Sequence, residues 1–164
     1  MRELNQIRDA VVSALQAAGM CALVSYPDQR AGRYAGPVAA VAVETAESRT
    51  VGFCNYLGEV FDTGAGAPRE LYGKQLEAVI SIEIRGQRAA DCEQGCETAA
   101  EVLLERLPAG IRPGELNWEA LTWERETGLF LRRGRLRCRA YFLARAEEGD
   151  TVFLDFRLKG AVTT

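Results

Sequence analysis

Cysteines, carboxylates and a glycine-rich stretch are the parts of this sequence that could do chemistry, and the sequence contains no histidine. Without histidine, the Ser-His-Asp and Cys-His nucleophile systems, the HExxH zinc sites and the usual histidine general base are all excluded. Three possibilities then remain to be weighed: a phosphate-binding loop, a thiolate metal site and a pair of catalytic carboxylates.

The glycine-rich stretch, Gly58 to Gly73, invites a phosphate-binding interpretation because Gly73-Lys74 resembles the end of a Walker A motif. The first glycine of that motif would fall at Pro68, however, and Gln75 replaces the Ser or Thr that holds magnesium. A dinucleotide fingerprint fails as well, because Arg69 stands at the position of its third glycine. We therefore predict a mobile loop with no packed element, of the kind that is either functional or disordered.

Two cysteines, Cys92 and Cys96, lie four residues apart, a spacing that would present two thiolates from one helix. Zinc needs two further ligands, which would have to come from Cys21, Cys54 or Cys138. Both helical cysteines fall on the apolar face, where a free cysteine behaves as a small hydrophobic residue. We expect buried, reduced thiols, no bound metal and no cofactor.

Three carboxylates near the tryptophans, Glu119, Glu124 and Glu126, could form an acid/base pair. Nothing in the sequence fixes their geometry, and charged residues on a strand usually form its solvated side. The sequence therefore predicts no catalytic activity, and a carboxylate-dependent hydrolase is the most distant alternative.

The most informative pattern is a pair of rows of opposite charge. The acidic row is Glu93, Glu97, Glu101 and Glu105, at every fourth position of a predicted helix. The arginine row is Arg133, Arg135, Arg137 and Arg139, alternating along one strand face. The arginine row could bind the phosphates of a nucleic acid or the acidic row of another copy, or both rows could be solvated faces. Our hypothesis is that the acidic row of one subunit faces the arginine row of the next.

The composition is that of an ordinary globular protein: 48% of the 164 residues are hydrophobic, 26% are charged, and the net charge is −3. We expect a single domain, residues 1–164, and a net charge this small does not by itself indicate nucleic-acid binding. No apolar run is long enough for a signal peptide or for the ~18 residues that cross a bilayer. The five cysteines, an odd number, fit reduced thiols in the cytoplasm.

The clearest periodicities lie in Lys74 to Leu107. Every second residue from Leu76 to Ile84 is apolar, which predicts a strand with one buried face. Apolar residues then recur at helical spacing from Ala89 to Leu107, which predicts an amphipathic helix on that face. We predict an α+β fold: a mostly antiparallel or mixed sheet of six to seven strands with two helices packed on one face.

The other elements are predicted from similar patterns. Before the central strand we expect a helix at Glu3 to Ala18 and strands at Cys21 to Tyr26, Pro37 to Glu44 and Arg49 to Tyr56. After the long helix we expect an irregular link at Pro108 to Gly114, and then a strand at Trp118 to Glu126 with Leu121 and Trp123 facing inward. A hairpin should follow at Leu129 to Ala146, with its turn at Arg132 to Arg135. The last expected element is a strand at Thr151 to Lys159.

This order of elements resembles the tail-terminator (tail-completion) family of tailed bacteriophages and prophages. The matching stretches are Glu3 to Ala18, Ser25-Tyr-Pro27, Gln75 to Arg85, Ala89 to Leu107 and Arg135 to Ala144. Asn55-Tyr-Leu-Gly-Glu59, Glu70-Leu-Tyr-Gly-Lys74 and Leu154-Asp-Phe156 also look like segments of prophage proteins.

The resemblance implies a structural subunit. Identical copies would form a hexameric ring that caps the finished tail tube and joins it to the head connector. Its partners would be other copies, the tail tube and head-connector proteins, with no membrane, and with nucleic acid only passing through the ring. It would be made in the bacterial host cytoplasm and end in the virion tail. Another neck or tail component, or an intracellular protein-binding adaptor module, remains the alternative.

Overall fold

The computed structural model describes residues 2–25 and 34–143. This part of the chain contains two α-helices, α1 (Arg2–Ala17) and α2 (Ala89–Glu105), and a short 3₁₀ turn, η2 (Phe53–Asn55). Its seven strands are β1 (Cys21–Leu23), β2 (Val38–Thr50), β3 (Tyr56–Asp62), β4 (Ala67–Gly86), β5 (Ile111–Trp118), β6 (Thr122–Glu124) and β7 (Leu129–Leu143).

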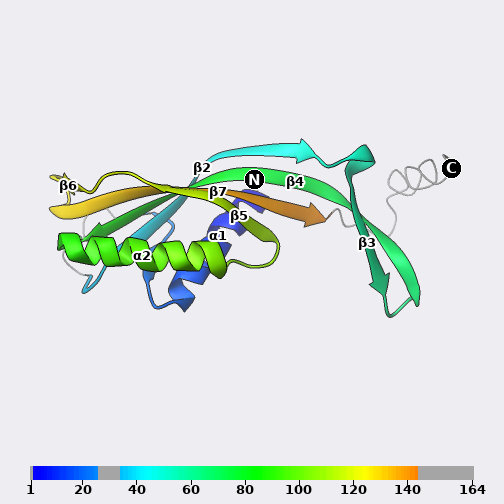
Figure 1. Ribbon diagram of the computed structural model, residues 1–164, viewed down its shortest axis with the longest axis horizontal. Coiled ribbons are helices and arrows are strands. Elements are labelled where there is room, and N and C mark those ends of the chain that lie inside the picture. Colours follow the sequence, from blue (N-terminus) through cyan, green and yellow to red (C-terminus); the bar gives the residue numbers. More distant parts are fainter. Residues whose placement is uncertain (1, 26–33, 144–164) are drawn as a thin grey trace.

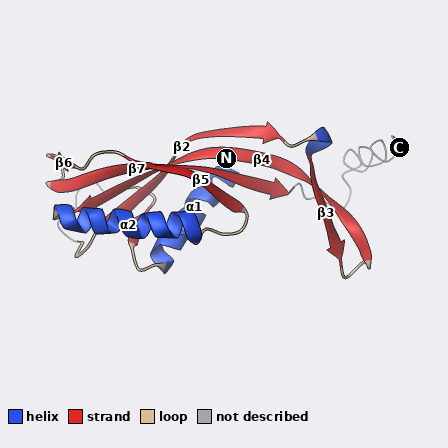
Figure 2. Ribbon diagram, viewed as in Figure 1, coloured by secondary structure: helices blue, strands red, loops and turns tan. Residues whose placement is uncertain are grey.

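The strands form a mixed sheet in the order β1-β2-β4-β7-β5, with β3 added to β4 and β6 added to β7. The β1–β2 pairing is parallel and the other pairings are antiparallel. Both helices lie on the same side of this sheet (Figures 1 and 2). The predicted α+β fold, with two helices on one face, is confirmed.

The hydrophobic core lies between the helices and the sheet. On β4, the alternate side chains from Leu76 to Ile84 are buried, as the period-two pattern predicts. Cys92, Ala99 and Leu103 of α2 pack onto them in a single cluster. The other side of the sheet, which we call the outer face, carries no helix of the described chain (Figure 2). None of the described helices is both long enough and apolar enough to cross a membrane.

A two-stranded arm extends from one end of the sheet, beyond both helices (Figure 1). We define the arm as residues Tyr56 to Tyr72, which comprise β3, a four-residue turn and the first part of β4. The turn is closed by Asp62, whose Oδ1 accepts hydrogen bonds from the backbone N–H groups of Gly64, at 2.9 Å, and Ala65, at 3.1 Å. Because β4 runs unbroken from Ala67 to Gly86, the arm is a direct extension of the central strand.

The arm corrects the prediction of a mobile loop at Gly58 to Gly73. The glycines and alanines there supply a tight turn and small strand residues, and Tyr56, Val60 and Phe61 give β3 its strand character. The sequence did not reveal this hairpin, because its two strands pair with each other and pack against no helix, so no pattern of buried residues marks them.

Two further predicted elements are wrong for local reasons. No strand spans Arg49 to Tyr56: β2 ends at Thr50, and the backbone turns through positive φ at Cys54 and Asn55. The hairpin predicted at Leu129 to Ala146 is a continuous strand, β7, up to Leu143. Its supposed turn residue Gly134 instead leaves space for the ring of Trp118, whose Cε3 would lie 2.6 Å from a Cβ there.

At the sheet edge, the irregular link predicted at Pro108 to Gly114 contains the start of β5, where Pro113 lies beside a break in register. An edge strand tolerates proline at such a position. Leu121 packs partly against the core, as predicted. Trp123 shares the face of its cross-strand partner Phe130, which packs against the core, but it is not buried: it is 53% exposed and contacts Phe130 edge-to-face, with ring centroids 4.9 Å apart. The strand predicted at Thr151 to Lys159 lies outside the described residues.

Candidate functional site

The arginine row lies on the outer face of the sheet, as its alternation predicts. All four of its side chains are exposed, and the residues between them on β7, such as Leu136 and Cys138, are buried toward the helices. β7 is flanked by β4 and β5, so the arginines lie among the outward side chains of both neighbouring strands.

Three members of the arginine row form ion pairs with carboxylates of the same chain. Arg133 Nε lies 3.0 Å from Glu83 Oε1. Arg135 Nε lies 2.8 Å from Glu44 Oε2, and its Nη1 lies 3.3 Å from Glu119 Oε1. The hydrogen bond to Glu44 raises the pKa of Arg135 above its usual value.

The third pair joins Arg139 Nε to Glu77 Oε1 at 3.3 Å. Three of the four arginines are paired with carboxylates of the same chain, so the outer face carries both positive and negative side chains. Such a face offers a nucleic acid far less attraction than the arginine row alone suggests.

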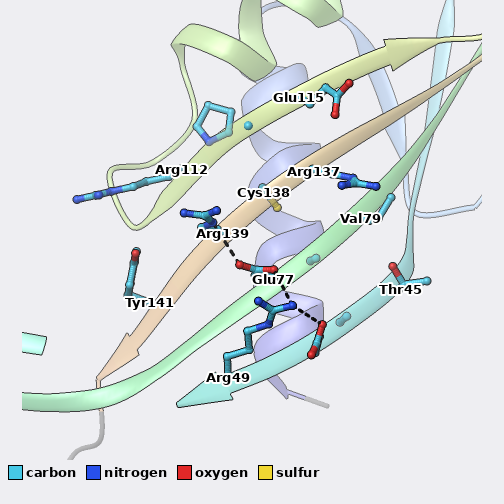
Figure 3. Close-up of a pocket in the computed structure, with 15 residues that line it drawn as sticks. Thr45, Arg49, Glu77, Val79, Arg112, Glu115, Arg137, Cys138, Arg139 and Tyr141 are labelled. Atoms are coloured by element: carbon cyan, nitrogen blue, oxygen red, sulfur yellow. Dashed lines mark hydrogen bonds and ion pairs between the residues drawn. The ribbon is translucent and has the colours of Figure 1, made fainter. Parts of the chain in front are cut away.

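A groove of about 760 Å³ crosses the outer face where β2, β4, β7 and β5 run side by side (Figure 3). At one side, Arg49 pairs with Glu47 at 3.1 Å and with Glu77 at 3.6 Å. At the other side, the Arg112 guanidinium lies 5.5 Å from the centre of the Tyr141 ring, within cation–π range.

Two arginines of this groove, Arg112 and Arg137, have no carboxylate within ion-pair distance in the described part of the chain. Of the three groove carboxylates, Glu47 and Glu77 are already paired with arginines, and Glu115 has no ion pair with any described residue. The groove therefore carries an excess of one positive charge, concentrated at the β5–β7 side.

The acidic row lies on the opposite side of the molecule, on the solvent-facing side of α2. All four glutamates are exposed, and Glu101 forms an ion pair with Arg106 just beyond the helix. The two rows of one chain therefore face away from each other. A single chain does not test the contact between copies, which remains a prediction.

The three carboxylates considered for acid/base chemistry have separate environments. Glu124 pairs with the buried side chain of Arg85 through two hydrogen bonds, at 2.9 and 3.1 Å. This hydrogen bonding lowers the pKa of Glu124, which keeps it charged and unsuited to proton donation. Glu119 pairs with Arg135, and Glu126 is exposed.

The helical cysteines lie in the core, as predicted. The Cys92 thiol donates to the carbonyl oxygen of Ile84 at 3.2 Å, and the hydrogen bond between Cys92 and Cys96 together with burial raises the pKa of Cys96. Within residues 2–25 and 34–143, no three histidine, cysteine, aspartate or glutamate side chains gather as metal ligands would.

Lys74, the residue that suggested a Walker lysine, lies within strand β4 and forms an ion pair with Glu3 of α1 at 2.8 Å. The hydrogen bond from Lys74 lowers the pKa of Glu3 to about 2. The lysine therefore ties the first helix to the sheet, and the surrounding backbone is extended rather than folded into a phosphate-binding loop.

The arm is the functional candidate that sequence reasoning missed. Strand pairing places Glu59 opposite Glu70 and Phe61 opposite Pro68 on one surface, which we call the arm face. Tyr72 joins this face through a 2.6 Å hydrogen bond from its hydroxyl to Glu70, and it contacts Tyr56 edge-to-face. The available signal was the set of strand-favouring residues Tyr56, Val60 and Phe61, which the neighbouring glycines obscured.

Comparison with known proteins finds similarity among solved structures. No family model matches this sequence, and no curated protein matches it. Among solved structures, the chain is similar to one from a structure described as "Virion of native gene transfer agent (GTA) particle". The two are 14% identical, the match covers 80% of this chain and 84% of the other, and the TM-score is 0.34. A TM-score and an identity this low do not establish a common function.

Proposed function

We propose that this protein is a structural subunit of a phage-like particle, and specifically a tail-terminator (tail-completion) protein of a bacteriophage or prophage. In this role it forms a ring that caps the tail tube and joins it to the head connector. The order of elements supports this proposal through its resemblance to that family, as do the two helices on one side of the sheet.

The observation that carries the proposal is the arm. A two-stranded ribbon is only marginally stable by itself in water. Here such a ribbon extends beyond both helices and exposes apolar side chains: Phe61 is 64% exposed and Val60 is 47% exposed. An exposed strand edge with apolar residues invites contact with another chain. We infer that assembly with another subunit completes the packing of the arm.

The outer groove supports a structural role over a catalytic one. It is an open depression on a sheet face, and its charged residues are mostly engaged in ion pairs with each other. Catalysis needs a nucleophile or a proton-transfer group held at a reacting atom. Of the carboxylates considered for this role, Glu124 and Glu119 pair with different arginines, and Glu126 is exposed. We propose that the protein is not an enzyme.

Light scattering and negative-stain imaging of the purified protein, alone and mixed with tail tubes, test this proposal. The expected result is a ring-shaped homo-oligomer that binds the ends of tubes. A ring that binds elsewhere in the particle would indicate another neck or tail component. A protein that stays monomeric at all concentrations and does not bind the ends of tubes would refute the proposal, and would favour the adaptor module.

A further inference from the structure

We propose that the arm of one subunit docks in the outer groove of a second copy, with Glu59 and Glu70 of the arm facing Arg112 and Arg137 of the groove. This inference rests on the proposed self-assembly and names the two surfaces that would carry it. It assigns Arg137, the one member of the arginine row that is used here, a different acidic partner from the one predicted from sequence.

The arm face carries negative charge that no cation of the described residues balances with an ion pair. Glu59 and Glu70 are directly opposite each other in the β3–β4 pairing. Like charges in this position are mutually unfavourable, and neither carboxylate forms an ion pair within the described chain. Burial, followed by the charges of these two glutamates, raises the pKa of Tyr56 beside them. The face therefore suits a positively charged partner.

The groove presents the complementary charge. Arg112 and Arg139 are direct cross-strand partners on β5 and β7, another pair of like charges. Glu77 pairs with Arg139, so Arg112 and Arg137 keep their positive charges without an ion pair in the described chain. In Figure 3, the labelled Arg112, Arg137 and Tyr141 lie toward the β5–β7 side of the groove.

Apolar and aromatic groups also match between the two surfaces. Phe61 of the arm face is exposed, and the groove offers the ring of Tyr141 and the side chains of Val79 and Pro113 among its charges. Burial of apolar surface supplies most of the affinity in such contacts, while the charges set register and the rate of encounter.

The arm cannot reach the groove of its own chain. β4 runs without interruption from the arm at Ala67 through the groove residue Glu77, so the two surfaces lie end to end along one strand. The contact must therefore join two copies through two different patches. Such a head-to-tail contact closes into a ring when the rotation per subunit allows.

Charge reversal with rescue tests the contact. The arm variant is Glu59→Arg with Glu70→Arg, and the groove variant is Arg112→Glu with Arg137→Glu. We expect each double variant to weaken self-association by about tenfold or more, measured by sedimentation velocity at low salt, because two attractive pairs become repulsive. We expect the quadruple variant to regain most of the lost association.

Two controls separate the contact from general effects. Arg125→Glu reverses an exposed arginine outside the groove and should leave association unchanged. Circular dichroism and thermal unfolding of every variant establish that it is folded. Phe61→Thr should also weaken association, whereas Leu104→Gln, which changes an exposed leucine on α2, should not.

The possible outcomes are distinct. Rescue of the groove variant by Glu97→Arg with Glu101→Arg, and not by the arm reversals, would show that α2 is the partner and would overturn this inference. Rings that form equally well in all variants would overturn it while leaving the proposed function intact. A wild-type protein that never self-associates would overturn both.

Discussion

Replacing Glu124 with glutamine should destabilise the folded chain, because Glu124 balances a buried arginine. Arg85 is 7% exposed, and its guanidinium donates to both carboxylate oxygens of Glu124 and lies 2.8 Å from Glu83. A hydrogen bond to a charged group contributes about 1.5 to 3 kcal/mol. Glutamine keeps one acceptor but loses the charge, and Glu83 remains. We therefore expect a loss of about 1.5 to 3 kcal/mol in the free energy of unfolding.

Urea unfolding at pH 7, followed by circular dichroism, measures this loss. Glu126→Gln is the matched control, because Glu126 lies two residues away and is exposed, so it should change the free energy by no more than about 0.5 kcal/mol. A double-mutant cycle with Arg85→Met isolates the pair itself, and should give a coupling energy of about 1 kcal/mol or more. A loss below about 0.5 kcal/mol for Glu124→Gln would refute the reasoning.

The same pair predicts a pH dependence. The pKa of Glu124 in the folded chain lies below its ordinary value of 4.5, chiefly because of the hydrogen bonds from Arg85. The stabilisation is therefore fully present above pH 4.5 and is lost as the pH falls through the lower, folded pKa. The difference in thermal stability between wild type and Glu124→Gln should shrink as the pH is lowered from 7 to 3. A constant difference over that range would contradict the assignment.

Two substitutions and one labelling experiment test other parts of the fold. Gly73→Ala should prevent proper joining of the arm to the sheet, because a Cβ would overlap the carbonyl oxygen of Phe142; differential scanning calorimetry should show a fall in Tm. Gly95→Ala should cost roughly 1 to 3 kcal/mol in urea unfolding, since its Cβ would lie within 2.9 Å of both Pro37 and Ile84 where α2 meets the sheet. In thiol labelling of the native protein at pH 8, the exposed Cys21 should react fast and the buried thiols only on unfolding, since burial raises the pKa of Cys138 to about 11.

The fold could be predicted where one strand or helix has one buried side. The alternation from Leu76 to Ile84 and the helical spacing from Ala89 onward arise because both elements bury one side against the same core. Both elements form as predicted. β7 was misjudged because Gly134, which is buried, suggested a turn, and β2 was misjudged beyond that core. In β2, the residues after Val43 are mostly exposed, so no burial pattern marks where the strand ends.

For the candidate site, the sequence predicts which side chains share a strand face, but not which residues of other strands lie beside them. The alternation of Arg133 to Arg139 fixed their common face, because side-chain direction follows sequence parity within a strand. Which glutamates lie beside them depends on the register of β4 against β7 and on the bulge after Val43 in β2, and these are set by contacts between distant segments. The arm was missed for the same reason, since its two strands stabilise each other rather than a core.

The continuity of β4 has a mechanical consequence. The strand that forms half of the arm also lies at the centre of the sheet, where it is bonded to β2 on one side and β7 on the other. Hydrogen bonds between antiparallel strands run perpendicular to the strand axis, so a pull on the arm along β4 loads both ladders in shear and must strain many bonds at once. Tension applied at the tip would therefore pass directly into the most strongly packed part of the molecule, and we expect the arm to resist being pulled away from it.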